Sequence, residues 1–426
     1  MIRIGKVEYR ELDDRTVLDA DISIPQEALV RWKSFAGESE KYNDFSYITS
    51  DYEDHVPTRL FFSVEPENSC FLRKDRADAF VTAMLYYAMA TGEDIYSESP
   101  VSEELMFKLN HMWSKLISAT SRVRAISVHA EPAGPGNQGS GFVGTGMSMG
   151  ADSLHTLYEY GVLDVEDSYR LTHLTYFNVG ADRWRLQKGR KLDSLMEDLE
   201  EAARIRNKRM AQARQIAGEM HMGFVYLDSN ISEFYEGSHE SSHLFRSCAA
   251  AMALSGGFSK YYFSSTGLDH FDYQPSLRVD AAHYEQFVLP CLSTPVLEII
   301  CGGKPFTRLD KLDRISEFPI AQQYLITCDQ ESTCYRCTKD FRTIIAIDIL
   351  GRHKEYAGVF DPEKCAAVRR KAYGWLVLNR NSSEPAQLLW EKALAKRVIP
   401  FSAYPTALEI QIKRTVKKLL KRMKRG

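Results

Sequence analysis

Short apolar runs of strand length alternate with longer helical stretches through the middle of this chain of 426 residues. Strands that alternate with helices are typical of a parallel sheet with helices on both faces. We therefore predict an α/β fold of this kind for residues 123–350. The expected strands include 123–129, 171–178, 223–227 and 261–264, and the expected helices include 191–220 and 244–255.

Both ends of the chain depart from this alternation. Residues 1–122 combine short β-like runs with two amphipathic helices, and we expect a separate N-terminal α+β domain of unknown role there. Residues 351–404 predict a C-terminal helical extension. The helices expected at the two ends are 75–91, 103–119, 361–378 and 385–396.

The last stretch, residues 405–426, has the pattern of a basic amphipathic helix. Such a helix can lie on an anionic membrane surface or touch RNA. The interpretation we favour is a terminal helix whose apolar side packs on its own protein. The apolar positions are Ile412, Val416, Leu419, Leu420 and Met423, opposite Lys413, Lys417, Lys418, Lys421, Lys424 and Arg425.

Charge is distributed unevenly along the chain. Residues 413–426 hold eight lysines and arginines and no acid, so the formal charge of −3 leaves −11 for everything before them. An acidic body disfavours a broad nucleic-acid surface. Contact with nucleic acid is therefore expected only through the tail.

The sequence favours a cytoplasmic protein. No apolar run is long enough to span a membrane, and the N-terminus lacks the apolar core of a secretory signal. The eight cysteines are scattered along the chain, which favours reduced thiols.

Residues 141–157 are the strongest candidate for a functional site. Gly144, Gly146 and Gly150 give a turn of small residues after an apolar strand, and Asp152 and Ser153 follow where a helix begins. Glycines let a ligand approach the main chain closely, and a helix N-terminus presents free N–H groups and a positive dipole end. Strand, small-residue turn and helix start together predict an anion site, with phosphate as the obvious ligand.

Residues Gly146–Gly150 also fit the G-x-S-x-G nucleophile motif of α/β-hydrolases, with Ser148 as the nucleophile. That mechanism needs an acid and then a histidine after the serine. The last histidine is His353, and no oxyanion loop of the His-Gly-Gly type precedes Ser148. The hydrolase interpretation also leaves Asp152 unexplained, and we keep it as the second alternative.

Polar residues follow the later strands of the predicted sheet. In a parallel sheet, ligands bind beyond the carboxyl ends of the strands. We therefore expect Asn178, Ser264 and Thr266 to lie over the loop at Ser148.

Three cysteines form a second informative group. Cys328, Cys334 and Cys337 have the spacing C-x5-C-x2-C, and two thiolates separated by two residues can hold one tetrahedral zinc ion. Asp340 could complete such a site, and so could Cys291 or Cys301 from elsewhere in the fold. Three ordinary reduced thiols are the alternative.

The order of these segments resembles a known family. Residues Ser148–Ser153 resemble the S-G-G-x-D-S loop of the PP-loop ATP pyrophosphatases, with Met149 where that family has glycine. The segment 308–311 and the run 334–343 follow in an order similar to that in uncharacterised PP-loop proteins related to the 7-cyano-7-deazaguanine synthase family. Asp340 stands where those proteins have the last cysteine of their cluster.

The resemblance implies an adenine nucleotide α-hydrolase-like fold, ATP and Mg²⁺ as cofactors, and Zn²⁺ at the cysteines as a further option. It implies adenylation of a carboxylate or carbonyl oxygen with release of pyrophosphate, followed by displacement of AMP by an amine, ammonia or thiol. The substrate would be a small molecule or a protein or peptide carboxylate. The implied ATP-binding residues are Gly146, Ser148, Gly150, Ala151, Asp152, Ser153, Asn178, Ser264 and Thr266. The implied catalytic residues are Asp152, Ser153, Arg308, Lys311, Lys339 and Arg342.

The first alternative to an enzyme is a degenerate PP-loop. Such a protein would bind a nucleotide or a partner protein without turnover. Met149 in the loop and Asp340 in the cysteine cluster are the two departures from the family pattern that motivate it.

Overall fold

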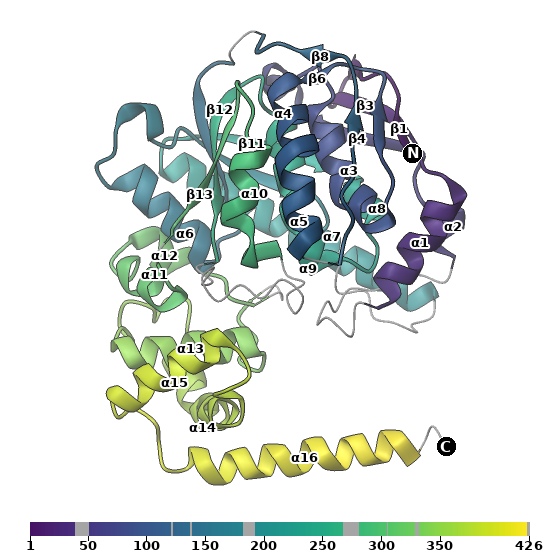
Figure 1. The fold of residues 1–426 in the computed structure, drawn as a ribbon. Helices are drawn as coiled ribbons and strands as arrows, with labels where there is room; N and C mark the ends of the chain where they lie inside the picture. The colour runs from purple at the N-terminus through teal and green to yellow at the C-terminus, as the bar shows by residue number, and fades with distance from the viewer. Residues whose placement is uncertain are drawn as a thin grey trace. The chain divides into compact units, whose positions relative to one another are not determined.

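The computed structural model describes residues 1–38, 51–120, 122–136, 139–181, 192–266, 281–304, 306–328 and 332–423. The chain forms two compact units (Figure 1). Unit 1 contains an eleven-stranded sheet and the helices that cover it. Unit 2 is helical and consists chiefly of Ser148–Glu159 and Gly303–Gly426.

Five parallel strands form one half of the sheet in unit 1. Their order is β13-β12-β9-β10-β11, and each pairs in parallel with its neighbour. From β9 the chain adds β10 and then β11 on one side of β9. It then crosses to the other side of β9, where it adds β12 and β13. This is the order of a doubly wound fold, with its switch point between β9 and β12. The strands are β9 (Phe142–Gly146), β10 (His173–Asn178), β11 (Gly223–Ser229), β12 (Phe258–Ser264) and β13 (Glu298–Gly302).

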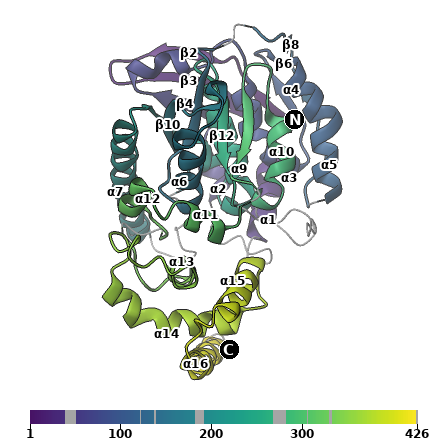
Figure 2. The same ribbon diagram turned by 90° about the vertical axis from the view of Figure 1, so that its left-hand side faces the viewer.

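Helices cover both faces of this sheet, as the alternation predicts. Figure 2 shows α7 on one side of the strands and α3, α9 and α10 on the other. This follows from the switch in strand order, because right-handed crossovers on the two sides of β9 place their helices on opposite faces. The helices are α3 (Asp78–Thr91), α7 (Leu192–Glu219), α8 (Ile231–Phe234), α9 (His239–Ala253) and α10 (Glu285–Leu292).

The N-terminal strands extend this sheet instead of forming a separate domain. β4 pairs antiparallel with β11, with Val64 opposite Leu227, and carries the sheet on through β3, β1, β5 and β7. Both of these side chains are buried, so the pairing joins their apolar faces in one core. The compact units therefore differ from the expected boundary at residue 122. The strands are β1 (Ile2–Ile4), β2 (Glu8–Glu11), β3 (Thr16–Ser23), β4 (Arg59–Val64), β5 (Ile95–Ser97) and β7 (Val128–His129).

The remaining elements of unit 1 include α1, which packs against α3, a helix that is buried along nearly its whole length. Gly92 ends α3 in the left-handed conformation, with φ of 70°, as predicted from its position. The expected helix over 103–119 is interrupted by a π-helical turn, Leu109–Trp113. The elements are α1 (Gln26–Gly37), α2 (Tyr52–His55), α4 (Glu103–Lys108), α5 (Ser114–Thr120), the two-stranded sheet of β6 (Val101–Ser102) and β8 (Pro132–Ala133), and short 3-10 turns at Pro66–Phe71, Asp167–Tyr169 and Ala281–His283.

Unit 2 combines the helix that follows β9 with the helices at the C-terminal end of the chain. α6 continues directly into a π-helical turn, Tyr158–Val162. The two helices expected in the C-terminal extension are present as α14 and α15. The helices are α6 (Ala151–Leu157), α11 (Arg308–Arg314), α12 (Pro319–Tyr324), α13 (Thr338–Leu350), α14 (Pro362–Asn379), α15 (Glu384–Ala395) and α16 (Ala403–Met423). In the described part of the chain, no helix has both the length and the apolar character that crossing a membrane requires.

The tail is helical, but the preferred interpretation of its apolar side is wrong. α16 packs against α14 through Ala403, Thr406 and Ala407, which are buried. Gly374 of α14 allows this approach, because a Cβ there would lie 2.8 Å from Thr406 Cγ2. The stripe that was expected to pack on the protein lies at other positions of the helix and is exposed at Ile412, Val416, Leu419 and Leu420.

Close packing of β9 and β12 gives a test of the sheet. A Cβ at Gly144 would lie 2.7 Å from Phe258 Cε1, whereas a Cβ at Gly218 in α7 would meet nothing within 4 Å. We expect Gly144→Ala to destabilise the chain by about 1–3 kcal/mol through overpacking. The matched variant Gly218→Ala should stabilise it by about 0.5–1 kcal/mol. Urea unfolding measures both, and equal effects would contradict the close contact at Gly144.

Candidate functional site

The turn after β9 leads directly into α6 and is held by short polar contacts. Ser148 Oγ lies 3.2 Å from Ser153 Oγ and accepts a weak hydrogen bond from the Gly150 N–H at 3.4 Å. Ser153 Oγ in turn donates to the Gly150 carbonyl at 3.1 Å. Gly150 is the N-cap of α6 and supplies no side chain to cap it. The first N–H groups of the helix are therefore left to other partners, which is the arrangement that favours an anion.

Met149 takes the backbone conformation that a glycine would have at this position. Its φ is 59°, in the left-handed region, which costs a residue with a Cβ on the order of 1 kcal/mol. Two interactions offset this cost, because the side chain is completely buried and the carbonyl accepts a hydrogen bond from Ile326 N at 2.8 Å. The substitution is thus accommodated by the fold, and the methionine side chain does not project into solvent from the turn.

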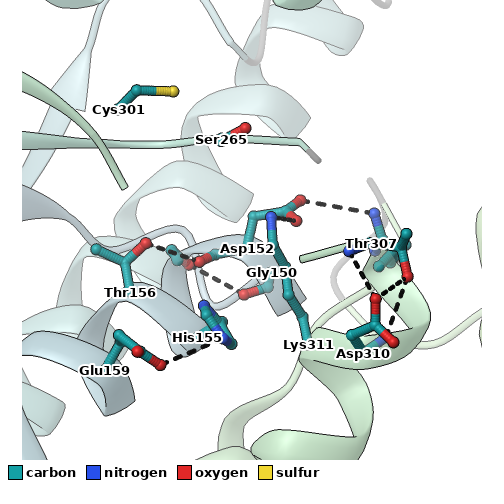
Figure 3. A network of polar contacts seen from close by, with 12 residues as sticks. Gly150, Asp152, His155, Thr156, Glu159, Ser265, Cys301, Thr307, Asp310 and Lys311 are labelled. Atoms are coloured by element: carbon teal, nitrogen blue, oxygen red, sulfur yellow. Dashed lines mark hydrogen bonds and ion pairs between the residues drawn. The ribbon is translucent and has the colours of Figure 1, made fainter. Parts of the chain in front are cut away.

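Cations from α11 meet the carboxylate of Asp152. Lys311 Nζ donates to Asp152 Oδ1 at 3.0 Å, and Arg308 Nη1 lies 3.8 Å from Oδ2. Figure 3 shows Asp152 and Lys311 pointing toward each other from α6 and α11. The Lys311 side chain is only 1% exposed, so its charge lies inside unit 2 and depends on nearby acceptors.

The start of α11 is fixed by a capping box. The Asp310 N–H donates to Thr307 Oγ1, while Asp310 Oδ2 accepts from the Thr307 N–H at 3.0 Å. This reciprocal pair satisfies free N–H groups of the first turn and sets where α11 begins. Arg308 and Lys311 are three residues apart and therefore lie on one face of the helix. A glycine at position 303 leaves room for the Lys311 side chain, because a Cβ there would lie 3.3 Å from Lys311 Cε. The backbone φ of Gly303 is 83°, which also favours glycine.

Arg342 on α13 adds a third cation. Burial, followed by repulsion from Arg308, lowers the pKa of its guanidinium to about 10, while Asp152 and Cys337 oppose that change. It remains charged at neutral pH. In the described part of the chain Arg342 forms no ion pair, and Arg308 pairs with Asp152 alone. Lys311 and Arg308 thus contact Asp152, and Arg342 is near enough to interact electrostatically with Arg308 and Asp152. Among the described residues positive charge exceeds negative charge in this cluster, which favours binding of an anion.

The sequence predicted these three cations near the loop, and the structure brings them together. Lys339, also predicted, is half-buried in the first turn of α13, three residues before Arg342. The nearby Arg314 is matched by Glu159, whose Oε2 it meets at 2.6 Å. That pair therefore leaves the charge excess around Asp152 unchanged.

His155 belongs to the same cluster and was missed from the sequence. It lies on α6, completely buried, with its ring 5.1 Å from that of Phe306 and Nε2 3.6 Å from Glu159 Oε2. Burial, and then the charge of Lys311, lowers its pKa to about 4, so the ring is neutral at physiological pH. A single histidine in an amphipathic helix gave no signal. The buried environment of His155 becomes visible only in the folded structure, where α6 packs against α11.

Asn178, Ser264 and Thr266 lie at or just after the carboxyl ends of strands, and their expected position over the loop at Ser148 stays a prediction. Asn178 ends β10 and donates to Asp228 Oδ1 at 2.5 Å, next to it on β11. Ser264 ends β12, and Thr266 follows two residues later. Ser264 Oγ and Thr266 Oγ1 are buried and have no hydrogen-bond partner among the described residues. Buried hydroxyls without partners are rare, so each of these two needs a ligand or a water molecule.

The geometry does not support Ser148 as a hydrolase nucleophile. Its hydroxyl contacts Ser153 and Gly150, and no histidine of the described residues is within hydrogen-bond distance. His155 is neutral, and neither of its ring nitrogens has a hydrogen-bond partner in this part of the structure. His353, the last histidine of the chain, lies instead 3.2 Å from Asp348. A serine nucleophile needs a base within such a distance.

The cysteine cluster is assembled before α13. One ligand atom from each of Cys328, Cys334, Cys337 and Asp340 lies within 4.8 Å of all the others. Cys337 Sγ is 3.8 Å from Cys328 Sγ, and Cys334 Sγ is 3.1 Å from Asp340 Oδ2. Cys291 and Cys301, the alternative fourth ligands, are not part of this group. These four residues can hold a metal ion.

Asp340 has a second role in the cluster. Its carboxylate accepts hydrogen bonds from the N–H groups of Cys334 and Tyr335, at 3.0 and 2.8 Å, and from Thr327 Oγ1 at 2.8 Å. The completely buried side chain therefore shapes the cysteine loop whether or not it also binds a metal. Burial raises the pKa of Cys334, and a hydrogen bond with Cys328 raises that of Cys337. The thiols of Cys334 and Cys337 therefore keep their protons at neutral pH when no metal is bound, and metal binding to them must release those protons.

Comparison of the chain with protein-family models, curated proteins and solved structures found no match in any of the three. A function must therefore be argued from the geometry of the two units.

The neutral state of His155 predicts a pH dependence. Its pKa of about 4 lies below the 6.5 of a free histidine, so its contribution to stability is complete above pH ~6.5 and is lost as the pH falls toward 4. We expect His155→Gln to lessen the stability lost between pH ~7.5 and ~5 by about 2 kcal/mol. Urea unfolding of both proteins at the two pH values measures this difference, and equal losses would contradict a buried neutral imidazole.

The cysteine cluster predicts bound metal. Purified full-length protein should contain about one metal ion per chain by elemental mass spectrometry. Cys334→Ser and Cys337→Ser should each remove most of it, whereas Cys70→Ser, at an exposed cysteine, should not. Metal content that is independent of Cys334 and Cys337 would show that the ion binds elsewhere.

Proposed function

We propose that the chain binds ATP through the turn at Ser148–Ser153 and adenylates an oxygen of a carboxylate or carbonyl substrate, releasing pyrophosphate. The observation that carries this proposal is the cluster of three cations around Asp152, directly beside the start of α6. An uncapped helix start and an excess of positive charge among the described residues are features expected of a site that binds phosphate groups. The finer fold assignment, to the adenine nucleotide α-hydrolases, is part of the same proposal.

In this proposal the N–H groups at the start of α6 and the hydroxyl of Ser148 bind phosphate oxygens. Arg308, Lys311 and Arg342 stabilise the charge that grows on the pyrophosphate as it leaves. The substrate oxygen attacks the α-phosphorus while the bond from that phosphorus to the bridging oxygen breaks. Pyrophosphate takes the electron pair, and an amine, ammonia or thiol later displaces AMP. The chain need not supply a covalent nucleophile, which agrees with the environment of Ser148.

Asp152 acts here as a positioning residue. It holds Lys311 at 3.0 Å inside unit 2 and keeps the lysine charge available near the helix start. One carboxylate already beside two cations does not make a Mg²⁺ site, because this ion prefers several oxygen ligands in octahedral geometry. Mg²⁺ would arrive with the nucleotide phosphates, and we assign no step to it.

Zinc is the metal we propose for the cysteine cluster. Three thiolates and one carboxylate match the ligands that Zn²⁺ takes in structural sites, and four protein ligands leave no open position for substrate. The ion would hold Cys337, the N-cap of α13, and so fix the helix that carries Lys339 and Arg342. The role of zinc is then structural.

A degenerate site that binds nucleotide without turnover is the remaining candidate. Met149 was one of the two reasons to consider a degenerate site. Because Met149 is buried and takes the left-handed backbone conformation, the turn keeps its shape without glycine, and this reason no longer holds. Asp340, the second reason, is held by three hydrogen bonds within the cluster. Both departures are accommodated, so we favour an active enzyme.

ATP–pyrophosphate exchange in the presence of a panel of carboxylic acids tests turnover. We expect exchange with at least one acid, and a loss of about tenfold to a hundredfold in Arg308→Gln, because a hydrogen bond to a charged group contributes about 1.5–3 kcal/mol. Arg308 is partly exposed, so this variant should fold. Lys354→Gln, at an exposed lysine of unit 2, is the control and should exchange at the normal rate.

Calorimetric titration with ATP separates the two candidates. Binding without exchange for any acid would favour the degenerate site. Absence of ATP binding, or full exchange by Arg308→Gln, would rule out the proposed role of the cluster.

A further inference from the structure

We propose that α16 is a surface anchor that binds the chain to anionic lipid bilayers. This inference is independent of the ATP site and concerns only the last helix of unit 2. It depends on three observations: which side of α16 packs on the protein, which side is exposed, and how charge is placed along it.

The packed side of α16 uses small residues near its start. Ala403, Thr406 and Ala407 are buried against α14, and the close approach at Gly374 fixes the helix there. Spacings of three and one residue place these positions on one side of a helix with 3.6 residues per turn. The contact with α14 therefore anchors the start of α16 and leaves its other sides open.

Large apolar residues form a continuous stripe on another side of α16. Their positions are separated by four, four, four and three residues, so they follow one another along the helix surface. All are between 47% and 63% exposed. A stripe of this size on a terminal helix is costly in water unless something covers it. The members of the stripe are Tyr404, Leu408, Ile412, Val416 and Leu419.

The distribution of charge along α16 indicates which kind of partner covers the apolar stripe. Residues 413–426 hold eight lysines and arginines and no acid, and in the sequence of α16 they alternate with the apolar positions at helical spacing. A helix with one apolar side and one basic side can lie in the plane of an anionic bilayer. Its apolar side then contacts acyl chains, and its basic side contacts headgroups. Basic residues near such a surface are attracted by its negative potential.

Two other occupants fit less well. A second copy that paired stripe to stripe would cover the apolar residues but would leave the basic side of each helix without an acidic partner. RNA would use the basic side through its phosphates but would leave the large apolar residues in water. Anionic lipid is the partner that uses both sides of α16.

Flotation of full-length protein with vesicles tests the proposal. We expect binding to phosphatidylcholine vesicles that contain about a quarter phosphatidylglycerol, weaker binding to pure phosphatidylcholine, and loss of binding as salt screens the charges. Ile412→Asp combined with Val416→Asp should lower the bound fraction by at least about tenfold. Lys413→Gln combined with Arg414→Gln should lower it severalfold.

A matched control comes from the same unit. Leu394→Asp replaces a leucine on α15 that is 47% exposed, and it should bind vesicles like the unchanged protein. All variants should keep the thermal midpoint of the parent, because the substituted side chains are exposed. No binding to either vesicle, or normal binding by the Ile412/Val416 variant, overturns the proposal.

Two further outcomes also overturn it. A concentration-dependent dimer that the Ile412/Val416 variant abolishes would assign the stripe to a second copy. Binding of single-stranded RNA that depends on Lys413 and Arg414, but not on Ile412 and Val416, would assign the tail to nucleic acid.

Discussion

The buried ion pair between Lys311 and Asp152 is the interaction on which the site of unit 2 depends. An ammonium that is almost completely shielded from water requires compensation, and removal of one partner from such a pair typically costs about 3–5 kcal/mol. The pair joins the start of α6 to α11 through two residues that are 159 positions apart in the sequence. Its geometry therefore fixes the turn after β9 relative to the helix that carries Arg308. His155 is neutral because burial, and then repulsion from Lys311, lowers the pKa of its imidazole.

One carboxylate compensates the charge of one cation. Three cations lie near Asp152, namely Lys311, Arg308 and Arg342. Among the described residues the surplus comes from Arg308 and Arg342, and an anionic ligand would balance it. The cysteine cluster matters for the same reason, since Cys337 begins the helix on which Arg342 lies. In the proposed function, the metal and the ion pair hold two sides of one phosphate site: the cluster fixes α13, and Asp152 fixes α11.

The local pattern of apolar and polar residues predicted much of this arrangement. Pairings between strands that are far apart in the sequence were not predicted. Alternating apolar runs located β9, β10, β11 and β12 in the parallel half of the sheet, whereas β13 was not predicted. The strand expected at 123–129 is present only as Val128–His129, at the other end of the sheet. Asp152, Arg308, Lys311 and Arg342 were predicted to share a site. The antiparallel pairing of β4 with β11 was not predicted, because nothing in either strand identifies a partner so distant in sequence, and the N-terminal strands were therefore placed in a separate domain. Ile412, Val416 and Leu419 of the α16 stripe were identified from the sequence, whereas Tyr404 and Leu408 were not, and the side chain of Met423 lies outside the described residues. A pattern alone does not show which side of a helix packs. That side was decided by Gly374 and the small residues that face it.

Calorimetric titration of the full chain with inorganic pyrophosphate tests the central claim most directly, because pyrophosphate needs neither the acceptor substrate nor the adenine site. We predict saturable binding to the parent protein that Arg342→Gln weakens by about tenfold or more. Pyrophosphate binding that is equally strong without the Arg342 charge, or no binding at all, would contradict an anion site built around Asp152.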